Sequence, residues 1–191
     1  MIATFLLGAV GGCAATALAK WFAVRWRVIS RPDPVIPDHL RPVPYLGGVG
    51  IAIGAILSGL IATPMLIGFV AFTTVGLIDD LAEFRPLPKL VGQVAAIVVA
   101  VLSCKQLIRP LTGCTPLDIL LSGLWIAAVV NAFNFIDVCD GLAGFTSSVA
   151  LLMWAFLPGF PVQKGLIAAA GAIFGFLIWN VPPARKRSAA A

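Results

Sequence analysis

The fold class is decided by the N-terminal stretch Met1–Val24, which reads MIATFLLGAVGGCAATALAKWFAV and carries a single charged side chain, Lys20. Its length fits the roughly 17–25 apolar residues that a helix needs to cross a hydrocarbon core about 30 Å thick. The nearest basic residues, Arg25, Arg27 and Arg31, follow the apolar run, whereas a cleaved signal peptide carries them before it. We therefore expect a membrane-spanning helix here.

The composition extends this expectation to the whole chain. Of its 191 residues, 60% are hydrophobic and 11% are charged, against roughly 45–50% and about 25% in soluble domains. A water-soluble fold is therefore not expected. The net charge of +5 would suggest a nucleic-acid partner in a soluble protein, but most Lys and Arg residues lie at the ends of apolar runs, where membrane orientation explains them. We expect no nucleic-acid partner.

The apolar runs between Gly, Pro and charged breaks predict seven membrane spans. They cover residues 2–24, 47–62, 65–78, 90–108, 117–133, 141–158 and 165–181. The second and third runs are short and meet at Thr63-Pro64, which leaves a re-entrant pair and a total of six spans open. The predicted fold is all-α, a polytopic transmembrane helix bundle, with residues 1–191 as one integral membrane domain.

Basic residues orient this bundle, because short loops rich in Lys and Arg stay on the cytoplasmic side. One side collects Arg25, Arg27, Arg31, Arg41, Arg85, Lys89, Arg185, Lys186 and Arg187, and the other receives Lys105, Arg109 and Lys164. The N-terminus is thus predicted outside and the C-terminus in the cytoplasm. The cytoplasmic side also receives every acid except Asp118, and because acids contribute little to topology, this clustering needs another cause.

The first acidic motif is Gly76-Leu-Ile-Asp79-Asp80, at the end of an apolar run. Adjacent carboxylates repel each other and resist desolvation. A divalent cation would relieve both costs, and Mg²⁺ typically takes one or two carboxylates together with substrate phosphates. The alternative is a solvated helix end. Lys89 and Arg85 follow closely and offer cations for a pyrophosphate, or they are ordinary topology determinants.

The second acidic motif is Asn131-Ala-Phe-Asn134-Phe-Ile-Asp137-Val-Cys-Asp140-Gly141. If it is helical, Asn134, Asp137 and Asp140 share one face, and ionisable residues near membrane depth favour a functional role. The alternative is a polar turn in which Asn and Asp cap a helix that starts near Gly141.

A third candidate segment is rich in proline and runs from Pro37 to Gly48. Its His39 and Arg41 are candidates for binding phosphate or a nucleotide base. Each also has an ordinary interpretation, a loop histidine and a positive-inside anchor.

In this order the motifs resemble the glycosyltransferase family 4 membrane enzymes, the polyprenyl-phosphate N-acetylhexosamine-1-phosphate transferases. The resemblance is carried by His39-Leu-Arg41-Pro-Val-Pro with Gly47-Gly48, Gly76-Leu-Ile-Asp79-Asp80 with Lys89-Leu-Val-Gly-Gln93, the motif Asn131–Gly141, and Trp179-Asn-Val-Pro-Pro-Ala184. It implies a multi-pass protein of the bacterial plasma membrane with a cytoplasmic active face, and a homodimer is compatible with it.

The resemblance also implies an activity and roles for the site residues. An N-acetylhexosamine-1-phosphate would pass from a UDP-sugar to polyprenyl (undecaprenyl) phosphate, with release of UMP and a requirement for Mg²⁺, in cell-wall or surface-polysaccharide synthesis. By position, Asp79 and Asp80 would act on the lipid phosphate or the metal. Asn134, Asp137 and Asp140 would bind the nucleotide-sugar, and His39, Arg41 and Lys89 would line the same cleft. The implied catalytic residues are therefore the four aspartates.

Two departures from the family pattern set the alternative hypothesis. Val138 and Cys139 stand where the family usually has a glycine, and the family continues past Ala184 with a further metal-binding aspartate motif, more spans and a histidine-rich loop. We expect this chain to match the N-terminal part of the transferase domain. The alternative is a non-catalytic membrane remnant or a subunit that needs a separate C-terminal half. A channel or transporter is disfavoured because the acids gather at one face.

Overall fold

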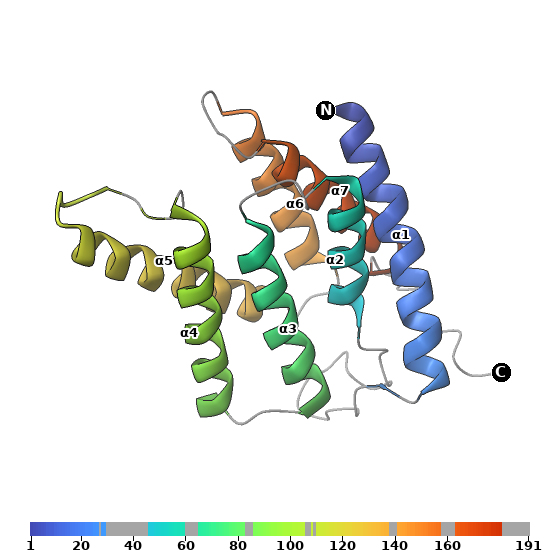
Figure 1. Cartoon of the computed structure of the whole chain (residues 1–191). Coiled ribbons are helices and arrows are strands. Elements are labelled where there is room, and N and C mark those ends of the chain that lie inside the picture. The colour runs from blue at the N-terminus through green and yellow to red at the C-terminus, as the bar shows by residue number, and fades with distance from the viewer. Residues whose placement is uncertain are drawn as a thin grey trace.

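In the computed structural model, the described residues are 1–26, 28–29, 46–59, 65–82, 86–105, 108, 110–137, 141–157 and 163–180. Within them the chain forms seven α-helices, one for each apolar segment expected from the sequence (Figure 1). They are α1 (Ile2–Arg25), α2 (Gly47–Ser58), α3 (Leu66–Ala82), α4 (Pro86–Ser103), α5 (Thr115–Ile136), α6 (Leu142–Ala155) and α7 (Gln163–Asn180). The all-helical prediction is confirmed for this part of the chain.

Several helix boundaries differ from the sequence expectation, and two of the differences lie beside the site. The apolar run predicts an end at residue 78, but α3 continues through Asp79 and Asp80 to Ala82. The next run predicts a start at residue 90, but α4 begins at Pro86, because the fixed φ of proline suits the first helical position. Lys89 is therefore a helical residue, and its side chain reaches back to α3.

The interior of the bundle is built from small residues. α1 packs along α7 and α2, α7 also contacts α2 and α6, and α3 packs against α4. Ala23, Ala55 and Ala172 are fully buried, whereas no large side chain in the described ranges is fully buried. Gly12 of α1 lies so close to α7 that an added Cβ would overlap the backbone of Ala172. Small residues allow helices to approach this closely, as is common in membrane proteins.

Large apolar side chains lie on the outside instead. Val10, Trp125 and Phe135 are 68%, 72% and 82% exposed, which suits contact with lipid. By length and composition, α1, α4 and α5 are long and apolar enough to cross a membrane. The chain is accordingly a membrane protein, while the number of spans and the orientation stay predictions.

The acids of α5 stand at its two ends. Asp118 lies in the first turn and Asp137 directly follows the last helical residue, so that about 28 Å of helix separates them at 1.5 Å per residue. The predicted separation of Asp118 from the other acids thus corresponds to opposite ends of one helix.

Asp118 fixes the loop that precedes α5. Its side chain is 4% exposed, and Oδ1 accepts hydrogen bonds from the N–H groups of Leu111 and Thr112, at 3.1 and 2.8 Å, and from the Thr112 hydroxyl, at 2.9 Å. We expect Asp118→Ala to accelerate amide exchange at both N–H groups, as measured by hydrogen exchange mass spectrometry, because their acceptor is lost. Asp118→Asn, which keeps an acceptor oxygen, should retain part of the protection. Equal exchange in the wild type and Asp118→Ala would contradict this.

Candidate active site

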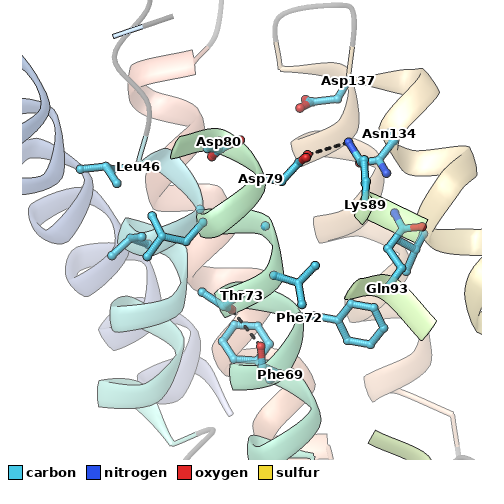
Figure 2. Close-up of a pocket in the computed structure, with 16 residues that line it drawn as sticks. Leu46, Phe69, Phe72, Thr73, Asp79, Asp80, Lys89, Gln93, Asn134 and Asp137 are labelled. Atoms are coloured by element: carbon cyan, nitrogen blue, oxygen red, sulfur yellow. Dashed lines mark hydrogen bonds and ion pairs between the residues drawn. The ribbon is translucent and has the colours of Figure 1, made fainter. Parts of the chain in front are cut away.

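A cavity of about 680 Å³ opens where the C-terminal ends of α3 and α5 meet the starts of α2 and α4 (Figure 2). Its polar residues come from three helices: Thr73, Asp79 and Asp80 from α3, Lys89 and Gln93 from α4, and Asn134 with the adjoining Asp137 from α5. Most other lining residues are apolar, and Figure 2 shows Phe69 and Phe72 at the opposite end of the cavity from Asp79 and Asp80. The cavity therefore joins a charged mouth to an apolar interior.

An ion pair links α3 to α4 at this mouth. Lys89 Nζ lies 2.8 Å from Asp79 Oδ2, and the two side chains are 38% and 19% exposed. In Figure 2, Lys89 lies on the side of Asp79 that faces α5. A partly exposed ion pair adds little stability, but the Lys89–Asp79 pair holds an ammonium group and a carboxylate at the entrance to the cavity.

Asp80 has a different environment from its neighbour. Partial desolvation and the adjacent charge of Asp79 raise the pKa of Asp80 to about 6, while Lys89 acts in the opposite direction and Asp137 adds a smaller upward effect. Two carboxylates in sequence cannot both be compensated by one lysine. Among the described residues, the mouth of the cavity therefore has more carboxylates than cations, which would favour binding of a further cation.

The end of α5 supplies the other two polar groups. Asn134 lies in the last turns of the helix and lines the cavity. Asp137 caps the helix, and its N–H donates to the Phe133 carbonyl at 3.0 Å. Helix α6 then begins after Gly141, whose φ of +78° is easily adopted only by glycine. Asp140, the aspartate nearest that helix start, lies outside the described residues, so the capping alternative stays a prediction.

The structure brings together five of the eight site residues predicted from the sequence: Asp79, Asp80, Lys89, Asn134 and Asp137. These residues come from three helices, and Asp79 and Asp137 are 58 positions apart in the chain. The other three, His39, Arg41 and Asp140, lie outside the described residues. Their roles stay predictions.

The donor set at the mouth can be compared with what a metal requires. Within the described ranges, no group of three His, Cys, Asp or Glu side chains is placed to hold a metal ion by itself. Asp79 and Asp80 offer two adjacent carboxylates, which is the number of protein ligands that Mg²⁺ commonly takes when phosphate oxygens and water complete its octahedron. The donor chemistry thus fits Mg²⁺ bound together with a phosphorylated substrate.

Among the lining residues that were not predicted as site residues, Gln93 and Leu46 have unusual features. Gln93 lines the cavity one helical turn after Lys89. The sequence signal for this residue is its position as an isolated amide in an apolar helix. Leu46 lines the cavity just before α2, with a left-handed φ of +77°, a conformation that costs a non-glycine residue about 1–2 kcal/mol. No sequence pattern marks Leu46.

The fold and the cavity together define a class: a helical membrane protein whose acid-rich cavity joins a polar mouth to an apolar interior. Comparison with known proteins gives the family. The model of glycosyl transferase family 4 matches residues 62–186, which include both acidic motifs. The chain belongs to glycosyl transferase family 4, and the family resemblance seen in the motifs is confirmed.

Three relatives illustrate this membership. The chain is 29% identical over 170 residues to the undecaprenyl-phosphate alpha-N-acetylglucosaminyl 1-phosphate transferase of Thermotoga maritima, covering 89% of this chain and 54% of that protein. It is 30% identical over 203 residues to the decaprenyl-phosphate N-acetylglucosaminephosphotransferase of Mycolicibacterium smegmatis, covering 87% and 50%. It is 31% identical over 178 residues to a phospho-N-acetylmuramoyl-pentapeptide-transferase of Picosynechococcus, covering 77% and 48%. The chain spans about half the length of these relatives.

Proposed function

We propose that the chain carries the cleft in which an N-acetylhexosamine-1-phosphate passes from a UDP-sugar to polyprenyl phosphate, with release of UMP. The observation that carries the proposal is the cavity itself. The adjacent carboxylates at its mouth would hold a metal ion that binds phosphates, Lys89 adds a cation, and the apolar interior suits a lipid chain. The names of the relatives give the same pairing of a polyprenyl phosphate with an N-acetylglucosamine phosphate.

The reaction requires positioning more than covalent chemistry by the protein. A phosphate oxygen of the lipid attacks the phosphorus that carries the sugar. A new P–O bond forms, the pyrophosphate P–O bond to UMP breaks, and the released UMP takes the bonding electron pair. Both substrates are anionic, so the cleft must hold them against their mutual repulsion.

The described residues divide this task between helices. In the described part of the cleft, Lys89 supplies a positive charge at the mouth, and ammonium groups stabilise phosphates through charge-assisted hydrogen bonds. Asn134 and Asp137 project from the end of α5 into the same space, where an amide and a carboxylate are suited to the hydroxyl and amide groups of a nucleotide-sugar. Asp140, His39 and Arg41 are assigned to the same cleft by sequence alone.

Asp79 and Asp80 would hold Mg²⁺ through their adjacent carboxylates. The bound ion supplies neutralisation of the charge that develops on the transferred phosphoryl group. Lys89 keeps the Asp79 carboxylate oriented towards the mouth.

The mouth of the cavity is proposed to face the cytoplasm of a bacterium, in a multi-pass protein of the plasma membrane. The distribution of Lys and Arg along the chain supports this orientation. A cleft at this position would meet a soluble nucleotide-sugar and a lipid phosphate at the membrane surface.

The test is release of UMP by the purified chain in detergent, supplied with polyprenyl phosphate, UDP-N-acetylglucosamine and Mg²⁺. We expect release to fall at least about tenfold when EDTA removes the metal, because the charge of the transferred phosphate then lacks its counter-ion. UMP is quantified by chromatography, with the lipid omitted as a control. Absence of both UMP release and Mg²⁺-dependent binding of the UDP-sugar would contradict the proposal.

A third outcome would favour the alternative function. Binding of the UDP-sugar without UMP release would indicate a membrane subunit that lacks catalysis by itself. The specific observation behind this alternative is that the chain spans about half the length of its relatives.

A further inference from the structure

Gln93 is a polar residue among the apolar side chains that α4 buries. The buried positions of this helix are Gln93, Ala96, Ile97, Ala100 and Val101, and Gln93 is only 6% exposed. Burial of an amide costs free energy unless its polar atoms are hydrogen-bonded. A partner for this side chain is therefore required on a neighbouring helix.

That partner is Asn131 of α5. Its Nδ2 donates to Gln93 Oε1 at 3.4 Å and to the carbonyl of Ala127 at 2.9 Å. The shorter bond ties the Asn131 side chain to its own helix, and the longer one reaches across to α4. Together they couple the position of α5 to the position of α4.

The amide pair lies just below the charged mouth of the cavity. Gln93 follows Lys89 by four residues, which is about one helical turn. Asn131 precedes Asn134 by three residues and Asp137 by six, which is about one and two helical turns. Figure 2 shows Gln93 beneath Lys89 and Asn134. The pair thus joins the two helices next to the groups that the proposed reaction needs.

In the described part of the chain, α5 buries no side chain completely near the site. Its buried residues are Asp118 and Ser122, both close to the opposite end. It packs against α4 and contacts α6 at fewer positions. A hydrogen bond between α4 and α5 beside the mouth is therefore in a position to influence how α5 packs there.

We propose that Gln93 and Asn131 are a positioning pair, which fixes the end of α5 against α4 and so sets the distance between Asp79–Lys89 and Asn134–Asp137. The functional part of this inference rests on the proposed transferase function. Each substrate would still meet its own residues without the pair, but the two sets of residues would no longer be held at the reacting distance. The pair therefore affects the transfer step more than substrate binding.

The first test measures geometry and does not need activity. Spin labels on unnatural amino acids at Leu87 of α4 and Phe135 of α5, which are 71% and 82% exposed, report the distance between the helices near the mouth. We expect Gln93→Met and Asn131→Leu to broaden or shift the distance distribution. The exchanged pair Gln93→Asn/Asn131→Gln, which again offers one acceptor and one donor, should restore it. Val94→Met and Ala132→Leu, on exposed positions of the same helices, are the matched controls.

The second test measures the reaction. Gln93→Met and Asn131→Leu should each lower kcat by about ten- to a hundredfold, as expected for misplaced reacting groups, with KM for each substrate changed less than about twofold. The double variant should be no worse than either single variant, because both remove the same contact. Asn131 does not line the cavity, so a loss confined to Gln93→Met would instead mean direct contact of Gln93 with substrate and would overturn the pair.

The two tests separate this inference from the proposed function. An inactive wild type contradicts the transferase activity, whereas the distance measurement still decides whether the pair positions α5. A distance distribution that is unchanged in both single variants overturns the positioning role, whatever the activity.

Discussion

Asp79→Asn should lower Mg²⁺-dependent UMP release by about two to three orders of magnitude, the scale found when a group that stabilises transition-state charge is removed. The substitution keeps the size of the side chain but removes its charge. It weakens the 2.8 Å contact with Lys89 and takes away one of the two adjacent carboxylates proposed to hold Mg²⁺. Asp80→Asn should have a comparable effect, although Asp80 has no ion pair with Lys89 in the structure.

Two further measurements show whether a loss has this cause. Mn²⁺ binding, followed by the electron paramagnetic resonance signal of the free ion, should weaken in both variants. Asp118→Asn makes the same chemical change at the opposite end of α5 and should leave kcat within about twofold of wild type, since its energetic role is local to the loop. If Asp79→Asn retained more than about a tenth of the wild-type rate, the assignment of Asp79 would be wrong.

Sequence alone predicted the helices well, because long apolar runs specify membrane helices independently of tertiary contacts. Of the boundary errors, two lie beside the site. Hydropathy ends a helix at the first charged residue, so it could not extend α3 through Asp79 and Asp80. In the structure, α3 extends beyond its apolar stretch, and Lys89 of the next helix forms an ion pair with the Asp79 carboxylate.

Convergence of the two acidic motifs was also predictable in outline, since helix ends that face the same side of a membrane can meet. What sequence could not give is which side chains touch. The contact of Lys89 with Asp79 depends on α4 starting at Pro86, and the contact of Gln93 with Asn131 depends on how α5 leans on α4. Both are properties of helix packing, and local patterns do not encode them.

The packing of α1 against α7 gives the second large expected effect. Gly12→Ala should destabilise the folded protein by at least about 3 kcal/mol, the upper part of the range for overpacked positions, because its Cβ would overlap the backbone of Ala172. Gly12 cannot retreat easily, since its other side faces Gly54 of α2, where a Cβ would in turn overlap the Gly12 backbone. For a chain of this size, such a loss corresponds to a decrease of roughly 6–12 °C in Tm, measurable by circular dichroism in detergent.

For the matched control, Gly76→Ala, we expect a change in stability of the opposite sign. Gly76 also lies within a helix, α3, but a Cβ added there meets nothing within 4 Å. Gly76→Ala should therefore stabilise the protein by roughly 0.5–1 kcal/mol, because alanine loses less backbone entropy than glycine when a helix forms. A general effect of glycine on helix formation would move both variants in the same direction. Opposite shifts in Tm can arise only if α1 and α7 approach at Gly12 too closely to admit a methyl group, and equal shifts would show that they do not.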